Sequence, residues 1–235
     1  RKGTLSRFPQ NVGWILVNFY CPPDGIVIDL FAGHNSRMQL VHECGRHYIG
    51  FDVSRNFMEA NRKIRDILLK RDDNSLIGKH AKIELYERSS DDTGLPDEYG
   101  DFSITSPPYF KLEDYGDEPE QLGKSMTYED FLVKLKRHAV ENFRVLKWGA
   151  YCIWCINDFY WDAEYRPFHI DVVNMLTDSR FRLHDILIVD LTTTIQTSWA
   201  QRVHEWKTFP KRHEYAVILQ KSKSKKRVVD YTDKL

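Results

Sequence analysis

Short apolar runs alternate with segments of helical periodicity along this chain, and that order limits the folds open to it. The apolar or β-branched runs, each bounded by turn residues as buried strands are, lie at residues 25–31, 47–53, 81–87 and 101–105. The helical patterns lie at residues 36–43, 55–70 and 128–146. Strands that alternate with helices form a parallel sheet with right-handed crossovers. The order therefore predicts an α/β fold with a mostly parallel, twisted sheet.

Three further strands are expected in the second half of the chain, at residues 151–156, 182–191 and 215–220. The last two are joined by a long loop, and we expect them to pair as an antiparallel hairpin at one edge of the sheet. The run KSKSKKR begins at residue 221 and predicts a basic, solvated tail over residues 221–235. Because 235 residues contain no internal repeat and no convincing boundary, we expect a single domain over residues 1–235.

The charge balance limits how the chain could bind nucleic acid. Its 34 Lys and Arg residues match 34 Asp and Glu residues, so any such binding needs a local basic patch rather than an overall basic surface. The sequence has no apolar run long enough to span a bilayer and no signal-peptide pattern at its start. We therefore expect no membrane partner and an intracellular, cytoplasmic location.

Cysteine and histidine usage predicts neither a redox pair nor a metal site. Cys152 and Cys155 form a C-x-x-C pattern, but the surrounding residues read as a buried strand, in which residues three apart point to opposite faces. We interpret both as structural cysteines in a reducing compartment. The nine histidines show none of the spacings typical of metal ligands, so no metal is expected.

The segment VIDLFAGHNSR at residues 27–37 combines a strand end with a turn of small residues. Asp29 closes the strand, and after Phe31 the small residues Ala32 and Gly33 let the backbone approach a ligand at the carboxyl end of the sheet. The next strand ends in Asp52, where a carboxylate can accept both hydroxyls of a ribose. Neither G-x-G-x-x-G nor a P-loop is present. The pair of signals favours a cofactor that contains adenosine.

The strand at residues 101–105 ends in Ser106, Pro107, Pro108 and Tyr109. Each proline fixes φ near −65° and lacks a backbone donor, so the strand must stop there. The tetrapeptide brings a hydroxyl, rigid carbonyls and an aromatic face together at the carboxyl end of the sheet. Taken alone, the tetrapeptide predicts either a stiff loop or a binding site for a flat ligand.

These segments together resemble the amino-directed DNA methyltransferases, which use S-adenosylmethionine to methylate the exocyclic amine of cytosine or adenine. The family's D-x-F-x-G-x-G motif appears here as DLFAGHN, with His34 and Asn35 in place of small residues, and its [DNS]-P-P-[YFW] motif appears as Ser106–Tyr109. The resemblance covers nearly the whole chain in order. It implies a Rossmann-like methyltransferase fold that binds S-adenosylmethionine.

Other segments extend the resemblance. SRFPQNVGWIL at residues 6–16 resembles the segment that closes over the methionine end of the cofactor, the stretch around Ser90 and Asp91 resembles the adenine contact, and KRHEYAVILQK at residues 211–221 resembles the final strand. The implied cofactor-binding residues are Phe8, Pro9, Asp29, Phe31, Ala32, Gly33, Asp52, Ser90 and Asp91. The implied catalytic residues are Ser106, Pro107, Pro108 and Tyr109.

The chemistry of the family suits the tetrapeptide. A base inside a duplex must be flipped out, or be single-stranded, before its amine can reach a methyl donor. Tyr109 could stack on such a base, while Ser106 and the Pro107 carbonyl accept hydrogen bonds from its amine. No nucleophile is required. Methylation at carbon 5 of cytosine would need a Pro-Cys pair, whereas Cys21 and Pro22 stand in the opposite order.

Serine at the head of the tetrapeptide favours the 4-amino group of cytosine in DNA as the acceptor, as in restriction–modification enzymes of bacteria and phages. Three alternatives stay open: the 6-amino group of adenine, a glutamine side chain in a protein, and a catalytically silent nucleic-acid-binding module. The strandedness of the DNA, its target sequence and the oligomeric state are not determined by the sequence.

A loop at residues 192–212 is the expected DNA contact, because basic and aromatic residues interleave there. These residues are Trp199, Arg202, Lys207, Lys211 and Arg212. The segment at residues 111–127 is the other stretch long enough to read DNA.

Overall fold

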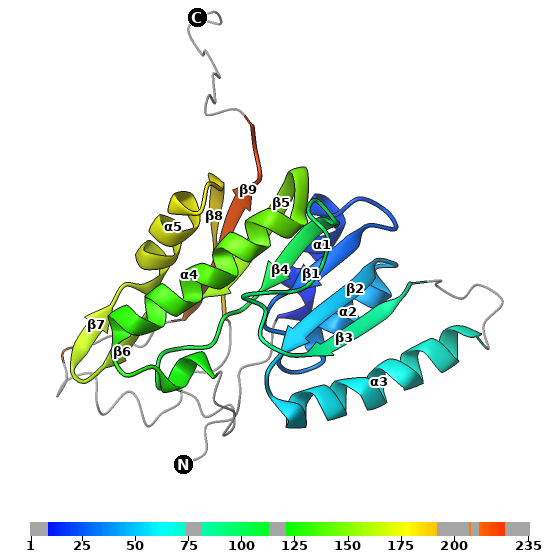
Figure 1. The fold of residues 1–235 in the computed structure, drawn as a ribbon, viewed down its shortest axis with the longest axis horizontal. Helices are drawn as coiled ribbons and strands as arrows, with labels where there is room; N and C mark the ends of the chain where they lie inside the picture. Colours follow the sequence, from blue (N-terminus) through cyan, green and yellow to red (C-terminus); the bar gives the residue numbers. More distant parts are fainter. Residues whose placement is uncertain (1–8, 74–80, 113–120, 192–206, 208–211, 224–235) are drawn as a thin grey trace, which may run out of the picture.

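The computed structural model describes residues 9–73, 81–112, 121–191, 207 and 212–223. Its centre is a seven-stranded sheet in the order β3-β2-β1-β4-β5-β9-β8 (Figure 1). The strands are β1 (Ile26–Asp29), β2 (His47–Asp52), β3 (Ile83–Glu87), β4 (Gly100–Thr105), β5 (Leu146–Ile156), β8 (Arg182–Asp190) and β9 (His213–Gln220). Each predicted strand is present, with bounds that differ by a few residues.

Strands β1 to β5 pair in parallel, so their carboxyl ends meet at one edge of the sheet. Strand β9 runs antiparallel to both β5 and β8, which leaves β8 as the edge strand. The predicted α/β fold with a mostly parallel sheet and an antiparallel edge hairpin is therefore confirmed.

The three predicted helices are α2 (Ser36–Glu43), α3 (Arg55–Asp73) and α4 (Tyr128–Val145). Helix α4 has clear end signals: Thr127 caps its N-terminus by accepting a hydrogen bond from the backbone N–H of Asp130 at 3.0 Å, and Arg144 lies in its last turn. These signals explain why its bounds were predicted to within one residue.

Several elements were not predicted from the sequence: α1 (Gln10–Tyr20), α5 (Phe168–Asp178), the 3-10 helix η1 (Leu122–Lys124) and the two-stranded sheet of β6 (Phe159–Trp161) and β7 (Glu164–Arg166). In α1 the apolar residues surround the helix, and Trp14 and Phe19 are exposed, so no amphipathic period marks it. Helix α5 follows Pro167, and the hairpin turns at Asp162 and Ala163, which have positive φ although neither is the glycine that would signal such a turn.

Two apolar layers cover the sheet. Helices α4 and α5 pack together on one face, and α1, α2 and α3 contribute to the core on the other (Figure 1). Cys152 belongs to the first core and Cys155 to the second, which confirms that the C-x-x-C residues point to opposite faces. Burial raises the pKa of Cys155 to about 12, so its thiol stays protonated at neutral pH.

The basic tail was predicted to begin at residue 221, and this boundary is wrong. Lys221 is buried, and its backbone N–H donates to the Ala150 carbonyl at 3.0 Å while its carbonyl accepts from the Gly149 N–H at 2.7 Å. Its ammonium lies 4.8 Å from the centre of the Phe143 ring and 3.2 Å from the Arg144 carbonyl oxygen. The backbone of Lys221 therefore extends the pairing between β9 and β5. Its ammonium can be buried there because an aromatic ring and a carbonyl oxygen take the place of water around the charge. Residues 224–235 lie outside the described part of the chain.

No helix among the described residues is long and apolar enough to cross a membrane.

Candidate functional site

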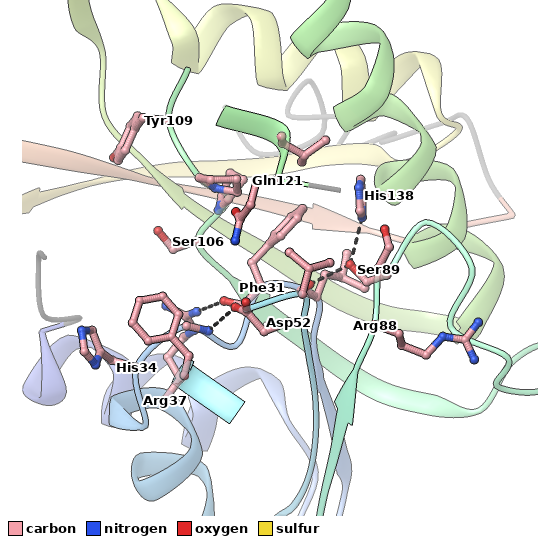
Figure 2. Close-up of a pocket in the computed structure, with 18 of the residues that line it drawn as sticks. Phe31, His34, Arg37, Asp52, Arg88, Ser89, Ser106, Tyr109, Gln121 and His138 are labelled. Atoms are coloured by element: carbon pink, nitrogen blue, oxygen red, sulfur yellow. Dashed lines mark hydrogen bonds between the residues drawn. The ribbon is translucent and has the colours of Figure 1, made fainter. Parts of the chain in front are cut away.

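A cavity opens at the carboxyl ends of β1 to β4, where the crossovers of a parallel sheet leave room for a ligand (Figure 2). It is lined by Leu30, Phe31, Gly33, His34, Ser36, Arg37, Asp52, Val53, Phe57, Arg88, Ser89, Ser90, Ser106, Pro107, Pro108, Tyr109, Gln121, Leu122, His138 and Glu214. All four predicted catalytic residues, Ser106–Tyr109, therefore share one cavity with four of the predicted cofactor-binding residues, Phe31, Gly33, Asp52 and Ser90.

Asp29 is a correction to the predicted cofactor set. It is fully buried and does not line the cavity. Its Oδ2 accepts hydrogen bonds from Arg37 Nε at 2.7 Å and Tyr48 Oη at 2.8 Å, and its Oδ1 accepts from Thr105 Oγ1 at 2.8 Å. Both carboxylate oxygens are thus occupied by the protein. Asp29 supports the loop after β1, and its side chain does not reach the cavity.

Arg37 lines the cavity although it was not predicted from the sequence as a site residue. Its guanidinium pairs with Asp29 and also donates to the carbonyl oxygens of Phe31 and Ala32, at 3.4 Å for Ala32. One side chain therefore ties the strand end to two residues of the following loop. The feature that could have marked Arg37 in the sequence is its position as a charged residue on the buried side of α2, next to the buried Met38. Ala32 is itself buried, and its N–H donates to the Phe51 carbonyl.

Gly33 and Asp52, both predicted to bind the cofactor, line the cavity and contact each other. The Gly33 N–H donates to Asp52 Oδ2 at 2.7 Å, and the Ser54 N–H donates to Asp52 Oδ1 at 2.8 Å. Gly33 has φ of +48°, a left-handed conformation that favours glycine. Burial raises the pKa of Asp52 to about 6, partly opposed by the two backbone donors. Each carboxylate oxygen still has a lone pair for a further donor.

The loop after β3 forms the wall of the cavity next to Asp52. Ser90 is buried and lines the cavity, and its Oγ lies 2.7 Å from the Leu30 carbonyl oxygen and 2.9 Å from His138 Nδ1. Asp91 is exposed and does not line the cavity. Of the predicted adenine contacts, Ser90 is therefore placed at the site and Asp91 is not.

Helix α4 holds this loop through residues spaced three apart, which share one helical face. Glu141 Oε1 accepts hydrogen bonds from the backbone N–H of Thr93 at 2.9 Å and from its hydroxyl at 2.5 Å. Arg144 Nη2 donates to the Leu95 carbonyl at 2.8 Å and pairs with Glu141. Together with His138, these residues fix the loop to the helix.

The tetrapeptide Ser106–Tyr109 lies at the carboxyl end of β4, and all four residues line the cavity. The Tyr109 ring packs on Phe159 and Phe168, with ring centres 5.8 Å and 6.0 Å apart. These contacts hold the ring at the cavity wall with part of its surface exposed. Gln121 and Glu214, which were not predicted from the sequence, also line the cavity.

Several predicted residues fall elsewhere. Pro9 precedes α1 and does not line the cavity. Lys207 and Arg212 are exposed. Phe8, Trp199, Arg202 and Lys211 lie outside the described residues. Within the described part of the chain, no three His, Cys, Asp or Glu side chains gather as metal ligands would.

Comparison with known proteins identifies the fold. No protein-family model matches the chain, and no curated protein matches it either. Among solved structures, an S-adenosylmethionine-dependent methyltransferase from Methanosarcina mazei is 16% identical with a TM-score of 0.60, over 93% of this chain and 99% of that one. A putative methyltransferase from Bacillus halodurans is 12% identical with a TM-score of 0.57, over 91% and 100% of the two chains.

A third similar structure contains a bound product of the cofactor. Geranyl diphosphate C-methyltransferase from Streptomyces coelicolor, crystallised with S-adenosyl-L-homocysteine, is 13% identical with a TM-score of 0.58, over 90% of this chain and 76% of that one. The chain therefore has the Rossmann-like methyltransferase fold that the sequence predicted. The expected cofactor agrees with these neighbours, whereas the name of the Streptomyces enzyme gives a small molecule, not DNA, as its substrate.

Proposed function

We propose that this chain is a methyltransferase that transfers a methyl group from S-adenosylmethionine to the 4-amino group of cytosine in DNA. The observation that carries the proposal is that Ser106–Tyr109 lines the same cavity as Gly33 and Asp52. A binding site for a planar amine and a binding site for an adenosine ribose thus open onto one cavity, as the transfer of a methyl group between two bound molecules requires.

The cavity suits the proposed cofactor. Asp52 is a partly buried carboxylate whose pKa is raised by burial, so two ribose hydroxyls would supply the donors that water no longer provides. Gly33, with no side chain, leaves the backbone open beside it, and a Cβ there would meet only the Phe31 carbonyl oxygen, at 3.8 Å. Ser90 and Val53 border the space next to Asp52, where the adenine would lie.

The bound cofactor supplies an electrophilic methyl group on a sulfonium. The chain's own residues bind and orient the amine that receives it. Ser106 Oγ and the Pro107 carbonyl oxygen accept hydrogen bonds from the amine, which directs the nitrogen lone pair into the cavity. Tyr109 stacks on the base and is itself held by Phe159 and Phe168.

A cysteine nucleophile does not enter this mechanism. All four cysteines are buried, and none of them lines the cavity. Burial raises the pKa of Cys21 to about 12, so the cysteine next to Pro22 stays a neutral thiol at neutral pH. The arrangement therefore supports methylation of an exocyclic amine rather than of a ring carbon.

Mass spectrometry of nucleosides tests the proposal. Single- and double-stranded DNA are incubated with the protein and S-adenosylmethionine, digested and compared with the Ser106→Ala/Tyr109→Ala variant. N4-methylcytosine formed by the parent alone is the expected result. N6-methyladenine alone would replace the acceptor and keep the mechanism. Cofactor binding without methylated nucleosides would reject DNA as the substrate, with the silent binding module as one explanation.

A further inference from the structure

His138 has no role in the proposed chemistry, yet it lines the cavity. It lies on α4 and is 4% exposed. Figure 2 shows it with Ser89 on one side of Asp52, while Ser106 and Tyr109 lie on the other. If Asp52 holds the ribose, His138 therefore borders the space for the purine and not the space for the methyl acceptor.

The hydrogen bonds of Ser90 determine which ring nitrogen of His138 carries the proton. The Ser90 hydroxyl has one hydrogen, and it donates to the Leu30 carbonyl oxygen, 2.7 Å away, which can only accept. Ser90 Oγ must then accept the hydrogen bond from His138 Nδ1, 2.9 Å away. His138 is thus the Nδ1–H tautomer.

The other ring nitrogen is left as an acceptor. Burial lowers the pKa of His138 to about 4, so the ring is neutral at physiological pH and Nε2 carries a lone pair. Nε2 has no hydrogen-bond partner among the described residues. The Phe31 ring packs against the imidazole, with centres 4.9 Å apart, and restricts its rotation. Because the ring lines the cavity, a bound ligand can supply a donor to Nε2.

We propose that His138 Nε2 reads the purine of the cofactor by accepting a hydrogen bond from its exocyclic 6-amino group. This inference rests on the proposed binding of S-adenosylmethionine. Adenine presents an N–H donor at that position, whereas hypoxanthine presents a carbonyl oxygen, which would face the Nε2 lone pair. Ser90 and His138 therefore act together, because the serine keeps Nε2 from becoming a donor.

Two ligands that differ at the 6-position of the purine, and in whether the adjacent N1 carries a hydrogen, test the proposal. The affinities of S-adenosylhomocysteine and S-inosylhomocysteine are measured by titration calorimetry for the parent and for His138→Leu. The parent should prefer the adenosyl compound at least about tenfold, the effect of one unmade hydrogen bond at a buried site. In His138→Leu the preference should disappear while circular dichroism shows a folded protein.

A second variant keeps the ring. In Ser90→Ala the Nδ1 hydrogen loses its acceptor, so the imidazole can adopt the Nε2–H tautomer and donate to the carbonyl of hypoxanthine. Its preference for the adenosyl ligand should fall even if His138→Leu does not fold. An unchanged preference in this variant would overturn the inference.

The remaining outcomes separate the two proposals. If the parent binds neither compound, the proposed cofactor is wrong and this inference fails with it. If the parent binds both equally, the cofactor site stands and the role of His138 is wrong. If Asp91→Asn removes the preference while His138→Leu keeps it, Asp91 reads the purine and His138 does not.

Discussion

Arg37 Nε lies 2.7 Å from Asp29 Oδ2, both side chains are buried, and the same guanidinium binds the carbonyls of Phe31 and Ala32. This ion pair ties the end of β1 to the loop that borders the cavity. The same loop carries His34 and Asn35, where the motif that it resembles has small residues.

Replacing Arg37 with Met should lower the free energy of unfolding by about 3–5 kcal/mol, because it leaves the Asp29 charge buried without its partner. Urea denaturation measures the change. Arg55→Met is the matched control: it removes an exposed pair with Glu59 on α3 and should change stability little. Equal effects of the two substitutions would contradict the role assigned to the buried pair.

Affinity for S-adenosylhomocysteine should fall as the pH is lowered from 7.5 to 5.5. Burial raises the pKa of Asp52 to about 6, so the carboxylate that accepts the ribose hydroxyls becomes protonated across this range. The ionised form binds the ligand, and affinity is therefore retained above pH 6 and lost below it. Calorimetry at several pH values should show this dependence in the parent and not in Asp52→Asn, which should bind weakly throughout.

Replacing Ser106 with Ala should lower kcat/KM by about 10- to 100-fold, since it removes a hydrogen bond to an amine that gains positive charge during transfer. Cofactor affinity should stay at the parent value. Thr127→Ala, which removes the N-terminal cap of α4, serves as the control: it should cost about 1 kcal/mol of stability without a comparable loss of rate. A Ser106→Ala enzyme with the parent's rate would exclude the serine from the reaction.

The Tyr109 ring should matter more than its hydroxyl. Tyr109→Ala removes the stacking surface and should weaken DNA binding by about 1–3 kcal/mol, whereas Tyr109→Phe keeps the ring and should bind close to the parent. Fluorescence anisotropy with single-stranded DNA at one fixed salt concentration measures both. If Tyr109→Phe is as weak as Tyr109→Ala, the hydroxyl and not stacking makes the contact.

Replacing Lys207 and Arg212 with Ala should weaken DNA binding and reduce its salt dependence, by close to one unit of the log-log slope for each phosphate that is no longer neutralised. Both side chains are exposed near the end of the predicted DNA loop. Lys63→Ala, an exposed lysine on α3, should leave affinity and slope unchanged. If the double variant keeps the slope of the parent, the segment at residues 111–127 becomes the better candidate.

The order of strands and helices could be predicted from the sequence because each buried strand is a local apolar run bounded by turns. The pairing of strand ends followed from the rules for parallel sheets, which is why Gly33, Asp52 and Ser106 were expected at one edge and are found there. Helix α1 escaped prediction because its apolar residues show no single face, and its position depends on packing against α2.

Long-range contacts decided which buried polar side chains meet at the site. Asp29 was expected to bind a ligand, but the partners that occupy it, Arg37, Tyr48 and Thr105, come from separate elements and meet it only in the folded chain. His138 lies 48 residues from Ser90, and nothing in the local sequence marks either as the partner of the other. Periodicity and turn residues encode secondary structure locally, whereas the saturation of a buried polar group depends on which side chains the tertiary structure brings to it.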